Sequence, residues 1–104
     1  MTAFFIVSRK FWVIGVIRRE ITIINKLGLH ARAAAKFVTL ASTFDSSVQV
    51  ARGDRVVNGK SIMGVMMLAA AKGVCLELII EGGDEERALD ELQQLILDRF
   101  GEPE

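Results

Sequence analysis

The sequence contains one histidine, His30, and it lies where the residue pattern predicts that a helix begins. Backbone N–H groups in the first turn of a helix have no intrahelical partner, and the helix dipole adds positive charge there. A phosphate group binds well at such a position. The same field disfavours the imidazolium ion, so we expect His30 to act as a neutral nucleophile. The position therefore predicts an acceptor for a phosphoryl group.

Three neighbours of His30 are suited to holding phosphate, and we expect Gly28, Ala31 and Arg32 to bind it. Glycine lets the backbone turn tightly, and a guanidinium group pairs with phosphate oxygens. Each residue also has an ordinary explanation, because an isolated histidine or arginine here is commonly a capping or solvated residue. The combination of His30 with these three neighbours favours a role in phosphate binding. No Asp or Glu lies within a few residues of His30, which suits a phosphoryl acceptor that must not activate water, although folding could bring a distant carboxylate close.

Apolar residues repeat with the period of a strand in four segments and with the period of a helix in three. The expected strands are residues 20–25, 47–52, 55–57 and 74–81. The expected helices are residues 30–41, residues 61–68 with Ser61 as N-cap, and a long helix that follows Asp84 as N-cap and includes Phe100. This β-α-β-β-α-β-α order predicts an α+β open-faced sandwich, in which a four-stranded antiparallel sheet carries three helices on one face.

Composition excludes several classes of protein. The 13 basic and 13 acidic residues balance, so no long-range field attracts nucleic acid. With one cysteine, Cys75, and one histidine, the chain has neither an internal disulfide nor a Cys/His zinc set. We therefore expect a cytoplasmic protein without a metal or other cofactor. Two apolar runs in the first seventeen residues are separated by Ser8-Arg9-Lys10 and are too short to cross a bilayer, so we expect no membrane insertion.

The segment after Ser61 predicts a short helix that is apolar on nearly every side. Ser61 is suited to act as its N-cap. The residues Ile62, Met63 and Met66 can fill a core, since methionine adapts to irregular gaps. In a domain this small, however, part of that surface is expected to stay exposed and to bind partner proteins.

Two segments resemble the signatures of a known family. GLHARAA at residues 28–34 and VNGKSIMGVMML at residues 57–68 are similar to those of HPr, the histidine phosphocarrier of the bacterial phosphoenolpyruvate-dependent phosphotransferase system. The resemblance extends over about residues 18–101. One departure is Ala33, where the family often has proline; alanine also suits a first helical turn.

The resemblance implies that enzyme I phosphorylates His30 on Nδ1 and that enzyme IIA domains receive the group, with Arg32 as the active-site arginine. It also implies that an HPr kinase/phosphorylase can phosphorylate Ser61, and that Ile62, Met63 and Met66 help to dock the partners. Such a protein is a stoichiometric carrier and not an enzyme, and we expect a monomer.

Residues 1–16 have no counterpart in the family pattern, whereas residues 17–104 are expected to form the HPr-like domain. We hypothesise that translation starts at Val16, because valine codons include GUG, an alternative bacterial initiator. In that case the preceding segment would be translated upstream sequence.

Other functions remain open at this stage. Within the family, a carrier for sugar uptake and a nitrogen-related regulatory carrier are not separated by these residues. A purely regulatory adaptor would bind its targets without passing phosphate onward, and the presence of His30 argues against it. A small nucleic-acid-binding domain is disfavoured by the balanced charge.

Overall fold

The computed structural model describes residues 16–104, so the interpretations of residues 1–15 concern a segment outside the described residues. Within residues 16–104, four strands and three helices follow one another in the expected order, and a short 3-10 turn, η1, follows the last helix. Their bounds are β2 (Ile17–Thr22), α1 (Ala31–Ala41), β3 (Ser47–Arg52), β4 (Arg55–Asn58), α2 (Ile62–Met66), β5 (Cys75–Glu81), α3 (Glu85–Leu97) and η1 (Arg99–Gly101). The α+β fold class is confirmed.

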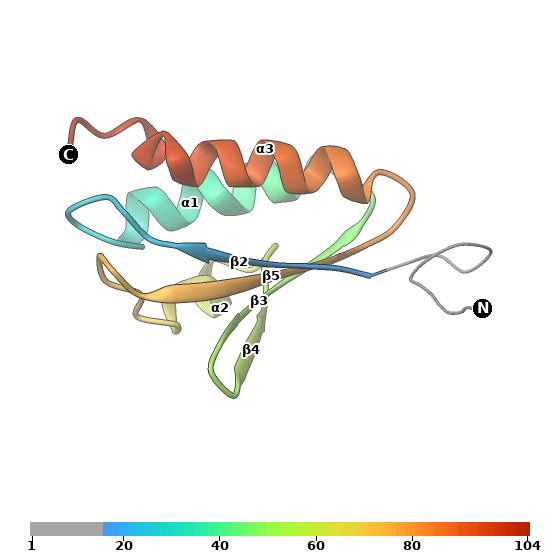
Figure 1. Cartoon of the computed structure of the whole chain (residues 1–104), viewed down its shortest axis with the longest axis horizontal. Helices are drawn as coiled ribbons and strands as arrows, with labels where there is room; N and C mark the ends of the chain where they lie inside the picture. The colour runs from blue at the N-terminus through green and yellow to red at the C-terminus, as the bar shows by residue number, and fades with distance from the viewer. Residues whose placement is uncertain (1–15) are drawn as a thin grey trace.

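The four strands form one antiparallel sheet in the order β2-β5-β3-β4. The register places Ile21 opposite Leu76 and Val50 opposite Leu78, so these apolar side chains point to the same face. Figure 1 shows α1 and α3 side by side over the sheet. The helices bury their apolar stripes against this face, and the open-faced sandwich follows from that one-sided packing.

One hydrophobic core joins the sheet to all three helices. Phe37 of α1, Val65 of α2 and Leu92 of α3 are buried together with Val50 and Leu78 of the sheet. The periodic apolar residues of α1 and α3 are therefore buried, as their spacing predicts. Their close packing holds the two helices rigidly against the sheet.

The first strand begins earlier than predicted. It spans Ile17–Thr22, whereas the expectation was residues 20–25. Its bounds are set by pairing with β5, which continues through the polar residues Arg18 and Arg19. Beyond the strand, Ile23 still bonds the segment before β5, because its N–H donates to Val74 O at 3.0 Å. The alternation of apolar and polar residues within β2 could not show where its partner strand, β5, ends.

Helix α2 is shorter than predicted, ending at Met66 and not near Leu68. Two arginines of the β3–β4 hairpin take up the carbonyls that follow it. Arg52 Nη1 donates to the carbonyls of Leu68 and Ala69 at 2.8 and 3.0 Å, and Arg55 Nη1 donates to that of Met67 at 3.0 Å. These contacts satisfy groups that a longer helix would bond internally.

Asp84 lies at the N-cap of α3 as predicted, but its side chain does not cap the helix. Its carboxylate accepts hydrogen bonds from the N–H of Asp45 at 2.9 Å, the N–H of Ser46 at 3.0 Å and the hydroxyl of Ser46. These bonds lower the pKa of Asp84 from 3.8 to about 2. The Asp84 side chain therefore links the loop before β3 to the start of α3 and does not cap the helix as expected.

The third helix was expected to include Phe100, and this was wrong. Helix α3 ends at Leu97, and Arg99, Phe100 and Gly101 all have positive φ values of 58°, 55° and 79°. Non-glycine residues adopt this left-handed region only where their surroundings compensate for the strain. Phe100 is completely buried in the core, which supplies that compensation.

Candidate functional site

His30 is the N-cap residue of α1, with φ −71° and ψ 177°. Its carbonyl accepts the first helical hydrogen bond, from Ala34 N–H at 2.8 Å, but its imidazole does not cap the helix. The N–H groups of Ala31, Arg32 and Ala33 thus precede the first helical donor and have no intrahelical acceptor. The unbonded N–H groups at the start of α1 therefore follow directly after a histidine whose side chain is 28% exposed.

The turn before His30 depends on Gly28. Its φ is +69°, and a Cβ atom there would lie 2.5 Å from Ala70 O and 2.9 Å from Ala71 Cα. Its N–H donates to Asn25 O at 3.2 Å, and its carbonyl accepts from Asn25 Nδ2 at 2.8 Å. Gly28 thus places the turn against the segment after α2, while its role as a phosphate ligand stays a prediction.

The C-terminal segment folds back onto this turn. The left-handed residues after α3 reverse the chain direction, and buried Phe100 anchors the reversal. Lys36 Nζ of α1 donates to Phe100 O at 2.7 Å. Further along, the backbone N–H of Lys26 donates to Glu104 O at 2.8 Å. The segment is therefore tied both to α1 and to the turn that precedes it.

This arrangement brings Glu102 to His30. One carboxylate oxygen of Glu102 pairs with Nε2 of the imidazole, and the other accepts from Asn25 Nδ2 at 2.9 Å. The Glu102 side chain is only 12% exposed. The hydrogen bond from Asn25, followed by that from His30, lowers the pKa of Glu102 below 4.5. At neutral pH a negative charge therefore lies against one nitrogen of the ring.

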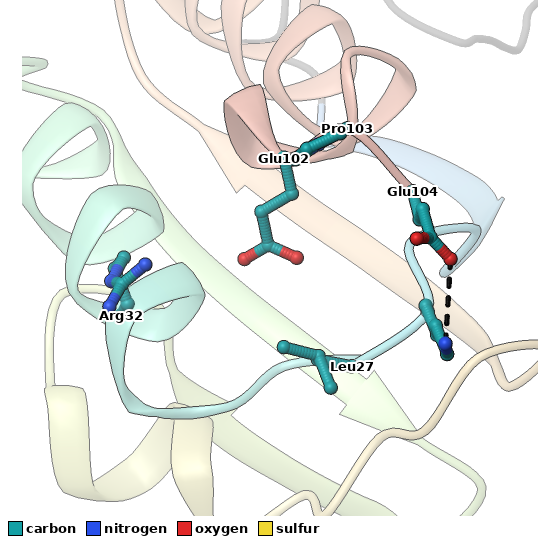
Figure 2. A pocket seen from close by; sticks show the side chains of 6 residues that line it. Leu27, Arg32, Glu102, Pro103 and Glu104 are labelled. Carbon is teal, nitrogen blue, oxygen red and sulfur yellow. Dashed lines mark ion pairs between the residues drawn. The ribbon is translucent and has the colours of Figure 1, made fainter.

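Beside this pair is a pocket of about 320 Å³, lined by Lys26, Leu27, Arg32 and the C-terminal residues 102–104. Figure 2 shows the Glu102 carboxylate pointing into the space between Leu27 and α1, the helix that carries Arg32. Lys26 and Glu104 form a surface ion pair at 3.5 Å on the rim. Arg32 is exposed, so its guanidinium is accessible to an anion at the helix start.

Ser61 is the N-cap of α2, where its hydroxyl oxygen accepts from Gly64 N–H at 3.1 Å. This confirms the capping interpretation. The predicted apolar surface is also exposed, most strongly at Met63, which is 73% exposed. We call the exposed side chains of Ile62, Met63, Met66 and Met67 the α2 patch.

The residues predicted from the sequence are thus distributed between two adjoining helices, since α1 and α2 contact each other. Sequence reasoning missed Asn25 and Glu102, and also Leu27 and Met67. Glu102 is 72 residues from His30, and no pattern along the chain relates the two. Leu27 and Met67 could have been found, because both are large apolar residues beside predicted turns or helix ends.

Residues 16–104 contain no cluster of three or more His, Cys, Asp or Glu side chains placed to hold a metal ion. In the same part of the chain, no helix is both long and apolar enough to cross a membrane.

A histidine presented at a free helix start, on an open-faced α+β sandwich, defines the class of small histidine phosphocarriers. Residues 17–98 match the family described as "PTS HPr component phosphorylation site". The phosphocarrier protein HPr of Neisseria meningitidis serogroup A is 56% identical over 89 residues, which cover 86% of this chain and all of that protein.

Solved structures agree with this match. HPr-C-His from Thermoanaerobacter tengcongensis has a TM-score of 0.82 and 46% identity, over 85% of this chain and 99% of that one. A structure described as an HPr dimer from the same organism has a TM-score of 0.68 and 50% identity, over 79% and 94%. The chain belongs to the HPr family, and it is a phosphocarrier of the phosphotransferase system.

Proposed function

We propose that His30 is the residue that carries the phosphoryl group, received from phosphorylated enzyme I and passed to enzyme IIA domains. The observation that carries this proposal is the position of the imidazole at the start of α1, where the N–H groups of residues 31–33 have no helical acceptor. A phosphoryl group on the ring would meet these donors and the positive end of the helix dipole. Arg32 is exposed and adds a positive charge beside them.

The carrier does not need to catalyse the transfer itself. Its ring supplies the nucleophile, while the partner proteins supply the groups that activate donor and acceptor. The protein then acts stoichiometrically in the cytoplasm, without a metal or other cofactor and as a monomer. The HPr dimer among the related structures makes the monomer a point to be tested by sedimentation.

Docking is proposed to use the α2 patch together with the start of α1. Exposed apolar side chains of this size mark a contact surface, and methionine adapts to partners of different shape. Ser61, at the N-cap of α2, is proposed as a regulatory phosphorylation site. A phosphate there would add negative charge directly beside the α2 patch and so disfavour an acidic partner.

Incubation with enzyme I and labelled phosphoenolpyruvate tests the assignment of His30. The wild-type chain should acquire an adduct that is labile in acid and stable in alkali, as expected for a phosphoramidate. His30→Ala should acquire none, whereas the control Ser61→Ala should be labelled like the wild type. Equal labelling of His30→Ala would show that another residue carries the group.

A further inference from the structure

The two nitrogens of the His30 ring have different surroundings. Every hydrogen bond that the structure describes for the ring is made through Nε2, and its partner is the Glu102 carboxylate. An ionised carboxylate can only accept a hydrogen bond. The proton of the neutral imidazole must therefore reside on Nε2, and the lone pair of the ring is on Nδ1.

The Glu102 carboxylate is itself held in place. Asn25 Nδ2 donates to its second oxygen at 2.9 Å, and the same amide nitrogen donates to Gly28 O at 2.8 Å. Asn25 is completely buried, so it orients Glu102 from a fixed position. The result is a chain of three side chains from Asn25 through Glu102 to His30, in which each group fixes the next.

The backbone around Glu102 is built to support this contact. Two residues before it, Phe100 is buried in the core, and two residues after it, a backbone oxygen of Glu104 accepts from Lys26 N–H at 2.8 Å. The left-handed residues 99 and 100 lie where the chain turns back towards α1. Strain kept in this way is more consistent with a functional position than with a loose chain end.

We propose that Glu102 is a positioning residue that selects Nδ1 of His30 as the atom that receives the phosphoryl group. The proposal rests on the phosphocarrier role of His30 and adds the group that decides which nitrogen reacts. Glu102 acts in two ways. It holds the proton on Nε2, which leaves Nδ1 nucleophilic, and its negative charge opposes a phosphoryl group at Nε2.

The transfer step balances without loss of a proton. The Nδ1 lone pair attacks the phosphorus of the phosphorylated donor, the N–P bond of Nδ1 forms, and the bond between phosphorus and the donor breaks with its electron pair left on the donor. The proton on Nε2 stays in the hydrogen bond to Glu102. The ring then carries a positive charge beside the carboxylate, which stabilises it and prepares the imidazole as a leaving group in the next transfer.

The selection of Nδ1 by Glu102 can be tested without any partner protein. The protein is phosphorylated with phosphoramidate, a small phosphoryl donor that releases ammonia. Nitrogen and phosphorus NMR distinguish products on Nδ1 and Nε2. The wild type should be labelled on Nδ1. Glu102→Gln should raise the share of the Nε2 product about tenfold, because a charge-assisted hydrogen bond is lost and the amide can present a donor to Nε2.

Glu104→Gln is the matched control, since it removes the same charge two residues away. Among the described residues, the Glu104 side chain forms an ion pair with surface Lys26 alone. This variant should give the wild-type product ratio. Glu102→Ala should reproduce the effect of Glu102→Gln, and unfolding curves verify that all variants are folded. A Glu102→Gln protein labelled on Nδ1 as selectively and as fast as the wild type would overturn the proposal.

Failure of the proposal and failure of the carrier role are separable. In the unphosphorylated protein, ring nitrogen spectra should show the proton on Nε2 in the wild type and a mixture of tautomers in Glu102→Gln. That measurement involves no phosphate. If the tautomers behave as expected but enzyme I does not label His30, the carrier role fails while the positioning effect stands.

Discussion

At the scale of the single residue, the two nitrogens of His30 have different surroundings. Nε2 is bound to the Glu102 carboxylate, and Nδ1 is the atom that we propose for the phosphoryl group. A serine protease uses the same division, because a carboxylate there fixes the histidine tautomer without taking part in proton transfer. In the proposed function the histidine itself is the nucleophile, so fixing its tautomer determines which atom reacts.

Ser61 combines a structural task with a proposed regulatory one. Its hydroxyl caps α2 through Gly64 N–H. We expect Ser61→Ala to lower the free energy of unfolding by about 1 kcal/mol, the usual cost of losing an N-cap. With HPr kinase and ATP, the wild type should gain an acid-stable phosphate that Ser61→Ala lacks.

Ser42→Ala is the control for both measurements, because Ser42 is an exposed serine at the end of α1. It should unfold like the wild type and keep the kinase-dependent phosphate. If the wild type is not labelled by the kinase, Ser61 is an N-cap and nothing more.

At the scale of elements, two connections hold helices in place through polar groups. The C-terminal segment ties the end of α3 to the start of α1, and Asp84 ties the start of α3 to the loop before β3. Helix α3 is thus linked at both ends, and the histidine at the start of α1 gains a fixed neighbour.

The Asp84 link predicts a dependence of stability on pH. Its pKa in the folded chain, about 2, lies below the ordinary value of 3.8. A lowered pKa stabilises the fold above the ordinary value, and this stabilisation disappears as the pH falls through about 2. Asp84→Asn should therefore be less stable than the wild type near neutral pH, and the difference should shrink between about pH 4 and pH 2.

Urea unfolding at several pH values measures this difference. Asp90→Asn is the control, because Asp90 is an exposed residue of the same helix; it should not reproduce the loss of stability at neutral pH. A difference between Asp84→Asn and the wild type that stays constant down to about pH 2 would show that the link does not depend on the charge of Asp84.

At the scale of the whole molecule, most of the fold could be predicted because its elements depend on local sequence patterns. The periodic apolar residues of α1 and α3 and the Gly53-Asp54 turn of the hairpin are each visible within a short window. Element ends were less predictable, since β2 begins where β5 offers a partner, and α2 ends where Arg52 and Arg55 bind the carbonyls that follow it.

The site was predictable in part for the same reason. His30, Arg32 and Ser61 lie beside helix starts that the sequence marks, whereas Glu102 acts on His30 across 72 positions. That contact exists only because Phe100 is buried and the chain reverses around it. No period or spacing could have placed a carboxylate there.

The packing of the whole molecule predicts that a chain beginning at Val16 folds by itself. The core extends from Ile21 to Phe100, and the family match covers residues 17–98. Since these residues share one core, a chain without residues 1–15 should still unfold in one cooperative transition. Urea unfolding of the full chain and of the chain beginning at Val16 measures this.

A chain beginning at Ile23 is the sensitive control, because it lacks all of β2 and its pairing with β5, and it should fail to fold stably. If the chain beginning at Val16 were equally unstable, the domain would have to include residues before Val16.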